Sequence, residues 1–74
     1  MTKVPRGLSS DKCVRALERA DFFVDRQKGS HIVMVRKNPS ARVIVPFTTS
    51  LPVGTLRSII RSAGMTVEEF VELL

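Results

Sequence analysis

The chain has one cysteine, one histidine and neither tryptophan nor tyrosine among its 74 residues. The lone Cys13 cannot form an intrachain disulfide, and without a cluster of cysteines and histidines we expect no metal site and no cofactor. No apolar run approaches the roughly 20 residues that cross a bilayer, and residues 1–8 are too short and interrupted for a secretory signal. These absences predict a soluble cytoplasmic protein with no membrane partner.

Acidic residues are scarce over most of the chain. Residues 1–64 hold all twelve lysines and arginines against four acidic residues, a balance of +8, whereas the whole chain has a net charge of +5. The difference comes from Glu68, Glu69 and Glu72 near the C-terminus. This asymmetry suits a polyanionic partner, either nucleic acid or an acidic protein. A solvated basic surface explains it equally well.

The length predicts a single domain, residues 1–74, in which residues 1–7 form a loose N-terminal arm. Ser9 is placed to cap a helix that runs to about Ala20, because Cys13, Val14, Leu17 and Ala20 recur at helical spacing. Three runs rich in β-branched and aromatic residues then predict strands at 22–27, 31–37 and 42–47, joined by turn residues. In the second strand neither face is cleanly polar, so we expect both faces of the sheet to be partly covered.

Two helices follow the third predicted strand. Pro52 suits the first turn of a helix whose apolar stripe ends at Ala63, and Gly64 suits the position just after its end. Thr66 and Glu69 have the spacing of a capping box and begin the last helix. The expected fold class is therefore α+β, with the order αβββαα and a three-stranded antiparallel sheet.

The bend between the first two predicted strands concentrates the chemistry of the chain. Residues 26–31 read Arg-Gln-Lys-Gly-Ser-His, so the only histidine, His31, follows a basic turn. Imidazole is the one side chain whose ordinary pKa, about 6.5, lies near neutrality, which makes His31 the acid–base candidate. Arg26 and Lys28 could stabilise a phosphate, and the backbone N–H groups of Gly29 and Ser30 could cradle one. The alternative is a histidine that merely begins a strand beside an ordinary hairpin turn.

Another basic pair lies on the second predicted helix. Arg57 and Arg61 are four residues apart, on the side opposite the apolar stripe, and this spacing suits contacts with the phosphates of RNA. Such a pair is usually a solvated ridge. Ser30 has no partners for a serine-hydrolase triad, and Cys13, on the apolar face of its helix, is expected to be buried and inert.

In several blocks the sequence resembles the HicA toxins of toxin–antitoxin pairs. The blocks are the Arg-Gln-Lys-Gly-Ser-His run at 26–31, the Val-Pro pair at 45–46, residues 54–64, and the Thr-Val-Glu-Glu-Phe run at 66–70. The resemblance implies a fold like a double-stranded RNA-binding domain, a ribonuclease that cuts mRNA, and a HicB-like antitoxin that covers it. It also implies that His31 is catalytic. Many relatives carry another histidine shortly after the Val-Pro pair, whereas this chain has Phe47 and Thr48.

The chemistry implied by the resemblance needs few protein groups. RNA supplies its own nucleophile, the 2′-OH, so cleavage requires a base, an acid and cations that stabilise the phosphorane. No pair of carboxylates flanks His31, which argues against a two-metal nuclease. The sequence therefore predicts a metal-independent endoribonuclease. Two alternatives are a non-catalytic module that binds double-stranded RNA, and an interaction protein that docks on an acidic partner.

Overall fold

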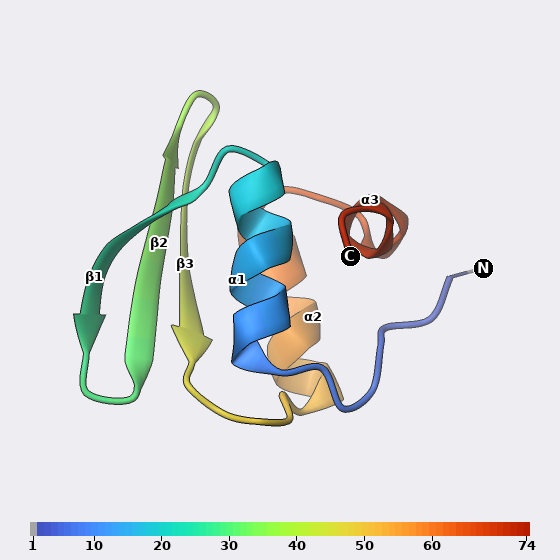
Figure 1. The fold of residues 1–74 in the computed structure, drawn as a ribbon. Coiled ribbons are helices and arrows are strands. Elements are labelled where there is room, and N and C mark those ends of the chain that lie inside the picture. The colour runs from blue at the N-terminus through green and yellow to red at the C-terminus, as the bar shows by residue number, and fades with distance from the viewer. Residues whose placement is uncertain (1) are drawn as a thin grey trace.

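The computed structural model describes residues 2–74 as one sheet with three helices (Figure 1). Six elements follow one another along the chain: α1 (Ser10–Arg19), β1 (Phe23–Lys28), β2 (His31–Lys37), β3 (Ser40–Pro46), α2 (Val53–Ser62) and α3 (Val67–Glu72). The strand order is β1-β2-β3, and both pairings are antiparallel. The predicted α+β class and the order αβββαα are confirmed.

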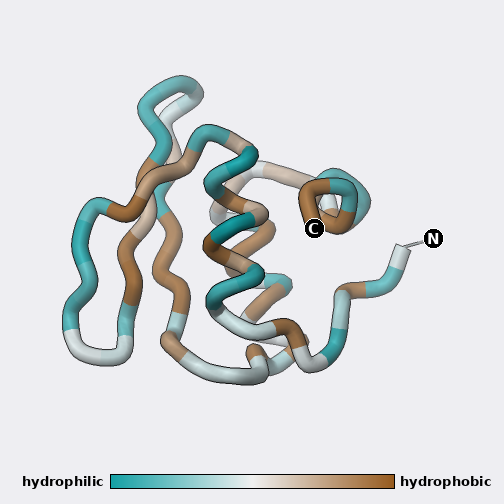
Figure 2. The backbone as a smooth tube through the Cα atoms, viewed as in Figure 1, coloured by the Kyte–Doolittle hydropathy of each residue, from teal (hydrophilic) through white to brown (hydrophobic). Residues whose placement is uncertain are grey.

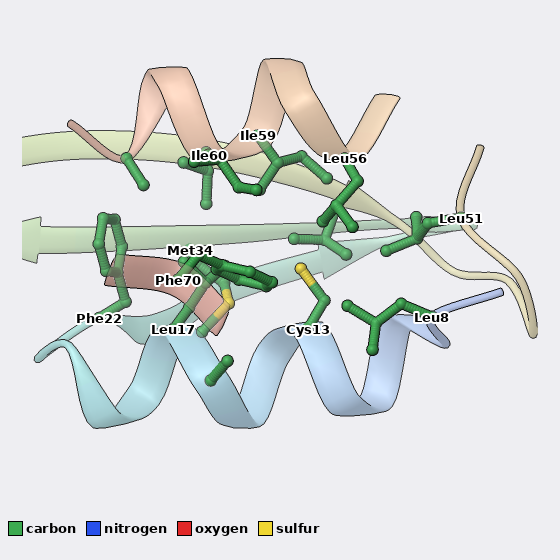
Figure 3. Packing of buried hydrophobic residues seen from close by; sticks show 14 of the residues in the cluster. Leu8, Cys13, Leu17, Phe22, Met34, Leu51, Leu56, Ile59, Ile60 and Phe70 are labelled. Atoms are coloured by element: carbon green, nitrogen blue, oxygen red, sulfur yellow. The ribbon is translucent and has the colours of Figure 1, made fainter. Parts of the chain in front are cut away.

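The helices α1 and α2 lie against one face of the sheet, and their buried side chains meet there (Figure 3). The sheet contributes Ile32, Met34, Val43 and Val45, which alternate along β2 and β3 with residues of the opposite face. Phe70 of α3 is fully buried in the same core. All three helices thus share a single core with the sheet, and the hydrophobic stretches of the tube in Figure 2 converge on it.

The opposite face of the sheet, here called the outer face, is not covered by any helix within residues 2–74 (Figure 1). The expectation that both faces are partly covered is therefore wrong. It arose because Val33 and Val35 share the outer face with His31, and such apolar residues suggest a covering layer. The side chains of neighbouring strands shield Val33 instead, leaving it 6% exposed, while Ile44 beside it is 47% exposed.

Helices α1 and α2 each end in a pair of backbone hydrogen bonds that close the last turn. After α1, the N–H of Phe22 donates to the carbonyl of Leu17, and the N–H of Asp21 donates to that of Glu18. The same double closure follows α2, with Gly64 at φ +76° in the left-handed region, as predicted for a residue just past a helix end. The predicted caps are confirmed too: the Ser9 hydroxyl accepts from the N–H of Lys12, and Thr66 and Glu69 form a capping box.

Two strands, β1 and β3, differ from their predicted ranges at both ends, and β1 runs one residue further than expected, to Lys28. β1 begins at Phe23 because Phe22 is drawn into the core by the closure of α1, where it is only 3% exposed. β3 begins at Ser40 and ends at Pro46, two residues earlier and one residue earlier than expected. Ser40 and Ala41 have little strand preference, but the short turn after β2 sets them opposite Lys37 and Arg36, and ladder pairing includes them.

The segment before α1 has neither helix nor strand over residues 2–9. Val4 nevertheless packs against the core, and Leu8 is buried. Thr2, Lys3, Val4 and Arg6 border a groove together with residues of α2 and α3. Within the described residues, no helix is both long enough and apolar enough to span a membrane.

Arg36 joins three parts of the fold, and its loss should destabilise the protein. Its guanidinium lies 4.7 Å from the ring centroid of Phe22 and donates to the carbonyls of Pro39 (2.9 Å) and Ala63 (3.1 Å). We expect Arg36→Ala to lower the free energy of unfolding by about 2 kcal/mol, because two hydrogen bonds and a cation–π contact are lost. Urea denaturation measures this. Lys37→Ala, at the exposed neighbouring position, is the control, and equal stability of the two variants would contradict the role.

Cys13 should be chemically inert in the folded protein. Its side chain is fully buried, and burial raises the pKa of its thiol from 9.0 to about 12. Below pH 9 the thiol keeps its proton in both the folded and the unfolded state. Between pH 9 and 12 only the unfolded chain loses this proton, so the free energy of unfolding falls as the pH rises. We expect iodoacetamide at pH 8 to label Cys13 only in denaturant. Over pH 9–11 the wild type should lose more stability than Cys13→Ala does. Rapid labelling of the native protein by iodoacetamide at pH 8 would contradict the burial of the thiol.

Candidate active site on the outer face of the sheet

His31 is the first residue of β2, the central strand, and its side chain is exposed on the outer face. The ladder fixes its backbone from both sides, because His31 pairs with Lys28 of β1 and with Pro46 of β3. A residue held between two strands has little backbone freedom, yet this imidazole remains open to a ligand from solvent. The predicted position, at the start of a strand and near solvent, is confirmed.

The predicted cations Arg26 and Lys28 lie on the same face as His31. The register of β1 places them there, because Lys28 pairs with His31, Gln27 with Ile32 and Arg26 with Val33. Beyond Arg26, Val24 pairs with Met34, so Asp25 is an extra residue that forms a bulge. Lys28 is then directly opposite His31, and Arg26 is one row further along the strand. Arg26 makes an ion pair with the adjacent Asp25 at 3.4 Å, but both side chains are exposed, so this pair holds the guanidinium only weakly.

The turn that precedes His31 is set by Gly29 and Ser30. Gly29 has φ +59°, a left-handed conformation that glycine adopts without strain, and a Cβ there would meet nothing within 4 Å. The carbonyl of Ser30 accepts from the N–H of Phe47 at 2.6 Å, which ties the turn to the end of β3. The hairpin and the segment after β3 are thus fastened together beside His31.

The sequence did not single out the residues that complete the surface around His31. Arg42 and Ile44 of β3 line one shallow depression with Arg26, Lys28, His31 and Val33. Arg42 is opposite Val35 and Ile44 is opposite Val33, so both lie on the outer face. Alternation along the predicted third strand separates these two residues from the buried Val43 and Val45, and this was the signal that could have found them.

Arg57 and Arg61 lie elsewhere. Both are exposed on α2, a helix that packs against the face of the sheet opposite His31. Arg57 borders the groove between the N-terminal segment, α2 and α3, together with Glu68. The structure therefore does not bring this pair together with Arg26, Lys28 and His31, and a contact of Arg57 and Arg61 with RNA stays a prediction about a separate surface.

Thr48 lies two residues after Pro46, in the segment where the resemblance led us to look for a second histidine. Its backbone is held by Ser10 at the start of α1: the Ser10 hydroxyl donates to the Thr48 carbonyl at 3.0 Å and accepts from the Thr48 N–H at 3.1 Å. The Thr48 hydroxyl accepts from the N–H of Ser50. This side chain caps a loop turn, and unlike imidazole it does not exchange protons near neutral pH.

The described part of the chain holds no cluster of metal ligands, and Cys13 lies away from His31. Among residues 2–74 no three side chains of His, Cys, Asp or Glu gather closely enough to hold a metal ion. Cys13 is buried in the core, on the other side of the sheet from His31. The depression around His31 therefore combines one imidazole with three cationic side chains, a set that can exchange a proton next to a bound anion.

Comparison with known proteins identifies the family of this chain. Residues 10–65 match a family model described as the HicA toxin of bacterial toxin-antitoxin. The matched segment covers most of the chain and includes the whole sheet, α1 and α2, whereas α3 follows it. No curated protein matches the chain. Because the family match spans well over half of the residues and contains the basic turn with its histidine, this protein belongs to the HicA toxin family.

Proposed function

We propose that this HicA toxin is an endoribonuclease that cleaves mRNA with His31 as its catalytic residue and without a metal ion. The observation that carries the proposal is the place of His31, exposed on the outer face, opposite Lys28 and in one depression with Arg26 and Arg42. Family membership supports RNA as the target. The site acts where mRNA is translated, in the cytoplasm.

In the proposed reaction the 2′-OH of a ribose attacks the adjacent phosphorus. The neutral imidazole of His31 accepts the 2′-OH proton, the new O–P bond closes a 2′,3′-cyclic phosphate, and the bond to the 5′-oxygen breaks. Lys28, opposite His31, offsets the extra negative charge of the phosphorane, and Arg26 supports it from the next row. The leaving oxygen takes its proton from water or from the imidazolium, because Thr48 provides no second imidazole.

The partner in this proposal is a HicB-like antitoxin that silences the toxin by covering His31. Family membership supports such a partner. An exposed histidine among cations on an uncovered sheet face would be accessible to RNA whenever the protein is free. A covering protein with acidic side chains would complement this face.

Replacement of His31 tests the catalytic assignment. We expect the wild type to arrest growth when expressed alone and His31→Ala not to, with cleavage of RNA in vitro falling by about 10²- to 10⁴-fold as for loss of a general base. The side chain is exposed, so stability should change by less than about 0.5 kcal/mol. Gln27→Ala is the matched control, because Gln27 is exposed on the adjoining strand but faces away from His31.

Two measurements accompany these growth assays: protein level and thermal unfolding of each variant. If His31→Ala is folded, equally abundant and equally toxic, His31 has no part in the mechanism. If neither protein cuts RNA while both bind it, the alternative of a non-catalytic RNA-binding module is correct. A protein that binds no RNA at any salt concentration would be one that docks on an acidic partner instead.

The absence of clustered metal ligands among residues 2–74 leads to a prediction about products. Cleavage should persist in excess EDTA and leave a 2′,3′-cyclic phosphate, or the 3′-phosphate formed when that ring opens. DNA, and RNA methylated on the 2′-oxygen at the cut site, should be inert because the nucleophile is missing. End-typing of labelled fragments checks this. Loss of activity in EDTA, or fragments that end in a 3′-hydroxyl, would contradict the mechanism even if His31 proved essential.

A further inference from the structure

The outer face carries three rows of side chains that the strand registers align. The rows are Lys28, His31 and Pro46; then Arg26, Val33 and Ile44; then Phe23, Val35 and Arg42. Each row crosses the three strands. Every row contains one cation from an outer strand, and none contains an acidic residue. The centre of the face is apolar, and its cations come from β1 and β3.

The apolar side chains of this face are accessible. Phe23 is 43% exposed and Ile44 is 47% exposed, and they lie on the two outer strands, on either side of Val33 and Val35. An exposed apolar surface flanked by cations fits a ligand that has both apolar and anionic parts. Unpaired nucleotides are such a ligand, because they present base faces as well as phosphates.

A double helix does not fit this face equally well. In a duplex the base faces are stacked on one another, and the surface consists of phosphates, sugars and groove edges. Against such a surface Phe23 and Ile44 would face phosphates and sugars, and burying these polar groups without a hydrogen-bond partner costs free energy. Only a strand whose bases can turn out of the stack engages the cations and the apolar side chains at the same time.

We infer that the outer face is a platform for single-stranded RNA, on which Phe23 and Ile44 contact bases while Arg42, with Arg26 and Lys28, contacts phosphates. This inference rests on the proposed function, since the platform delivers the strand to His31, and it adds Phe23, Arg42 and Ile44 as residues that select unpaired RNA. Arg42 lies in the third row and His31 in the first, about 13 Å apart along β2 at the usual rise per residue. The bound strand therefore extends beyond the nucleotide that is cut.

The test measures binding separately from cleavage, in the His31→Ala background. The probes are a short RNA of mixed sequence without self-pairing and the duplex formed with its complement, each titrated by fluorescence anisotropy at several salt concentrations. We expect the single strand to bind more tightly than the duplex. Adding Arg42→Ala should reduce the slope of log affinity against log salt by about one. Adding Phe23→Ala should weaken binding about fivefold or more while leaving the slope unchanged.

Matched controls come from the helix layer and the C-terminus. Arg15→Ala removes the same charge from the exposed side of α1, and Leu74→Ala removes an apolar side chain that is 45% exposed, close to the value for Ile44. Neither should change affinity for the single strand as much as its counterpart on the platform. Ile44→Thr, which keeps a β-branched residue in β3, replaces Phe23→Ala if the latter is unfolded, with the same expected loss.

Several outcomes would overturn the platform. The first is that the duplex binds as tightly as the single strand or more tightly. The second is an effect of Arg15→Ala as large as that of Arg42→Ala, and the third is unchanged affinity in both Phe23→Ala and Ile44→Thr. The fourth is no RNA binding at all, which is the result expected for a face that receives only an acidic protein. The proposed function is judged apart from these, by cleavage with the wild type. Cleavage without the expected binding pattern refutes the platform alone, and the binding pattern without cleavage refutes the ribonuclease alone.

Discussion

The structure depends on the pairing of β2 with both of its neighbours. Met34 and Ile32 enter the core from one side of this strand, while His31 and Val33 lie on the other side, so a shift of one residue would exchange the two sets. Burial of Met34, which is fully inaccessible, makes such a shift costly. The packing of the core thus determines that His31 faces outward, although His31 contributes nothing to that core.

The register of β2 also gives the two faces of the sheet different roles. Helices α1 and α2 bury the inner face, and the core closes around Leu17, Leu56 and Phe70 (Figure 3). The outer face remains open, with side chains held by a rigid ladder and by the turn at Gly29. A site on strands is positioned more accurately than one on a long loop, and this suits a reaction that requires an imidazole close to a particular hydroxyl.

The bulge at Asp25 decides which side chains of β1 belong to this site. If Asp25 were paired like its neighbours, strict alternation would put Phe23 on the face opposite Arg26 and Lys28. With the bulge, all three lie on the outer face, and Val24 turns toward the inner one. One irregular residue in the edge strand β1 therefore adds the aromatic side chain of Phe23 to the outer face. Without this irregularity β1 would contribute only the cations Arg26 and Lys28 to the surface around His31.

Local signals in the sequence determined most of the architecture. The cap at Ser9, the capping box of Thr66 and Glu69, and Gly64 past the end of α2 act through nearest neighbours, and each is found where the residues predict it. The sequence also singled out His31, Arg26 and Lys28, because they adjoin one turn. Tertiary structure alone decided that one sheet face is open, that Phe23, Arg42 and Ile44 join His31 there, and that Arg57 and Arg61 do not. These outcomes depend on strand register, on a bulge and on which face the helices cover. Alternation along residues 42–45 separates Arg42 and Ile44 from Val43 and Val45, but only long-range packing decides which of the two sets faces solvent beside His31.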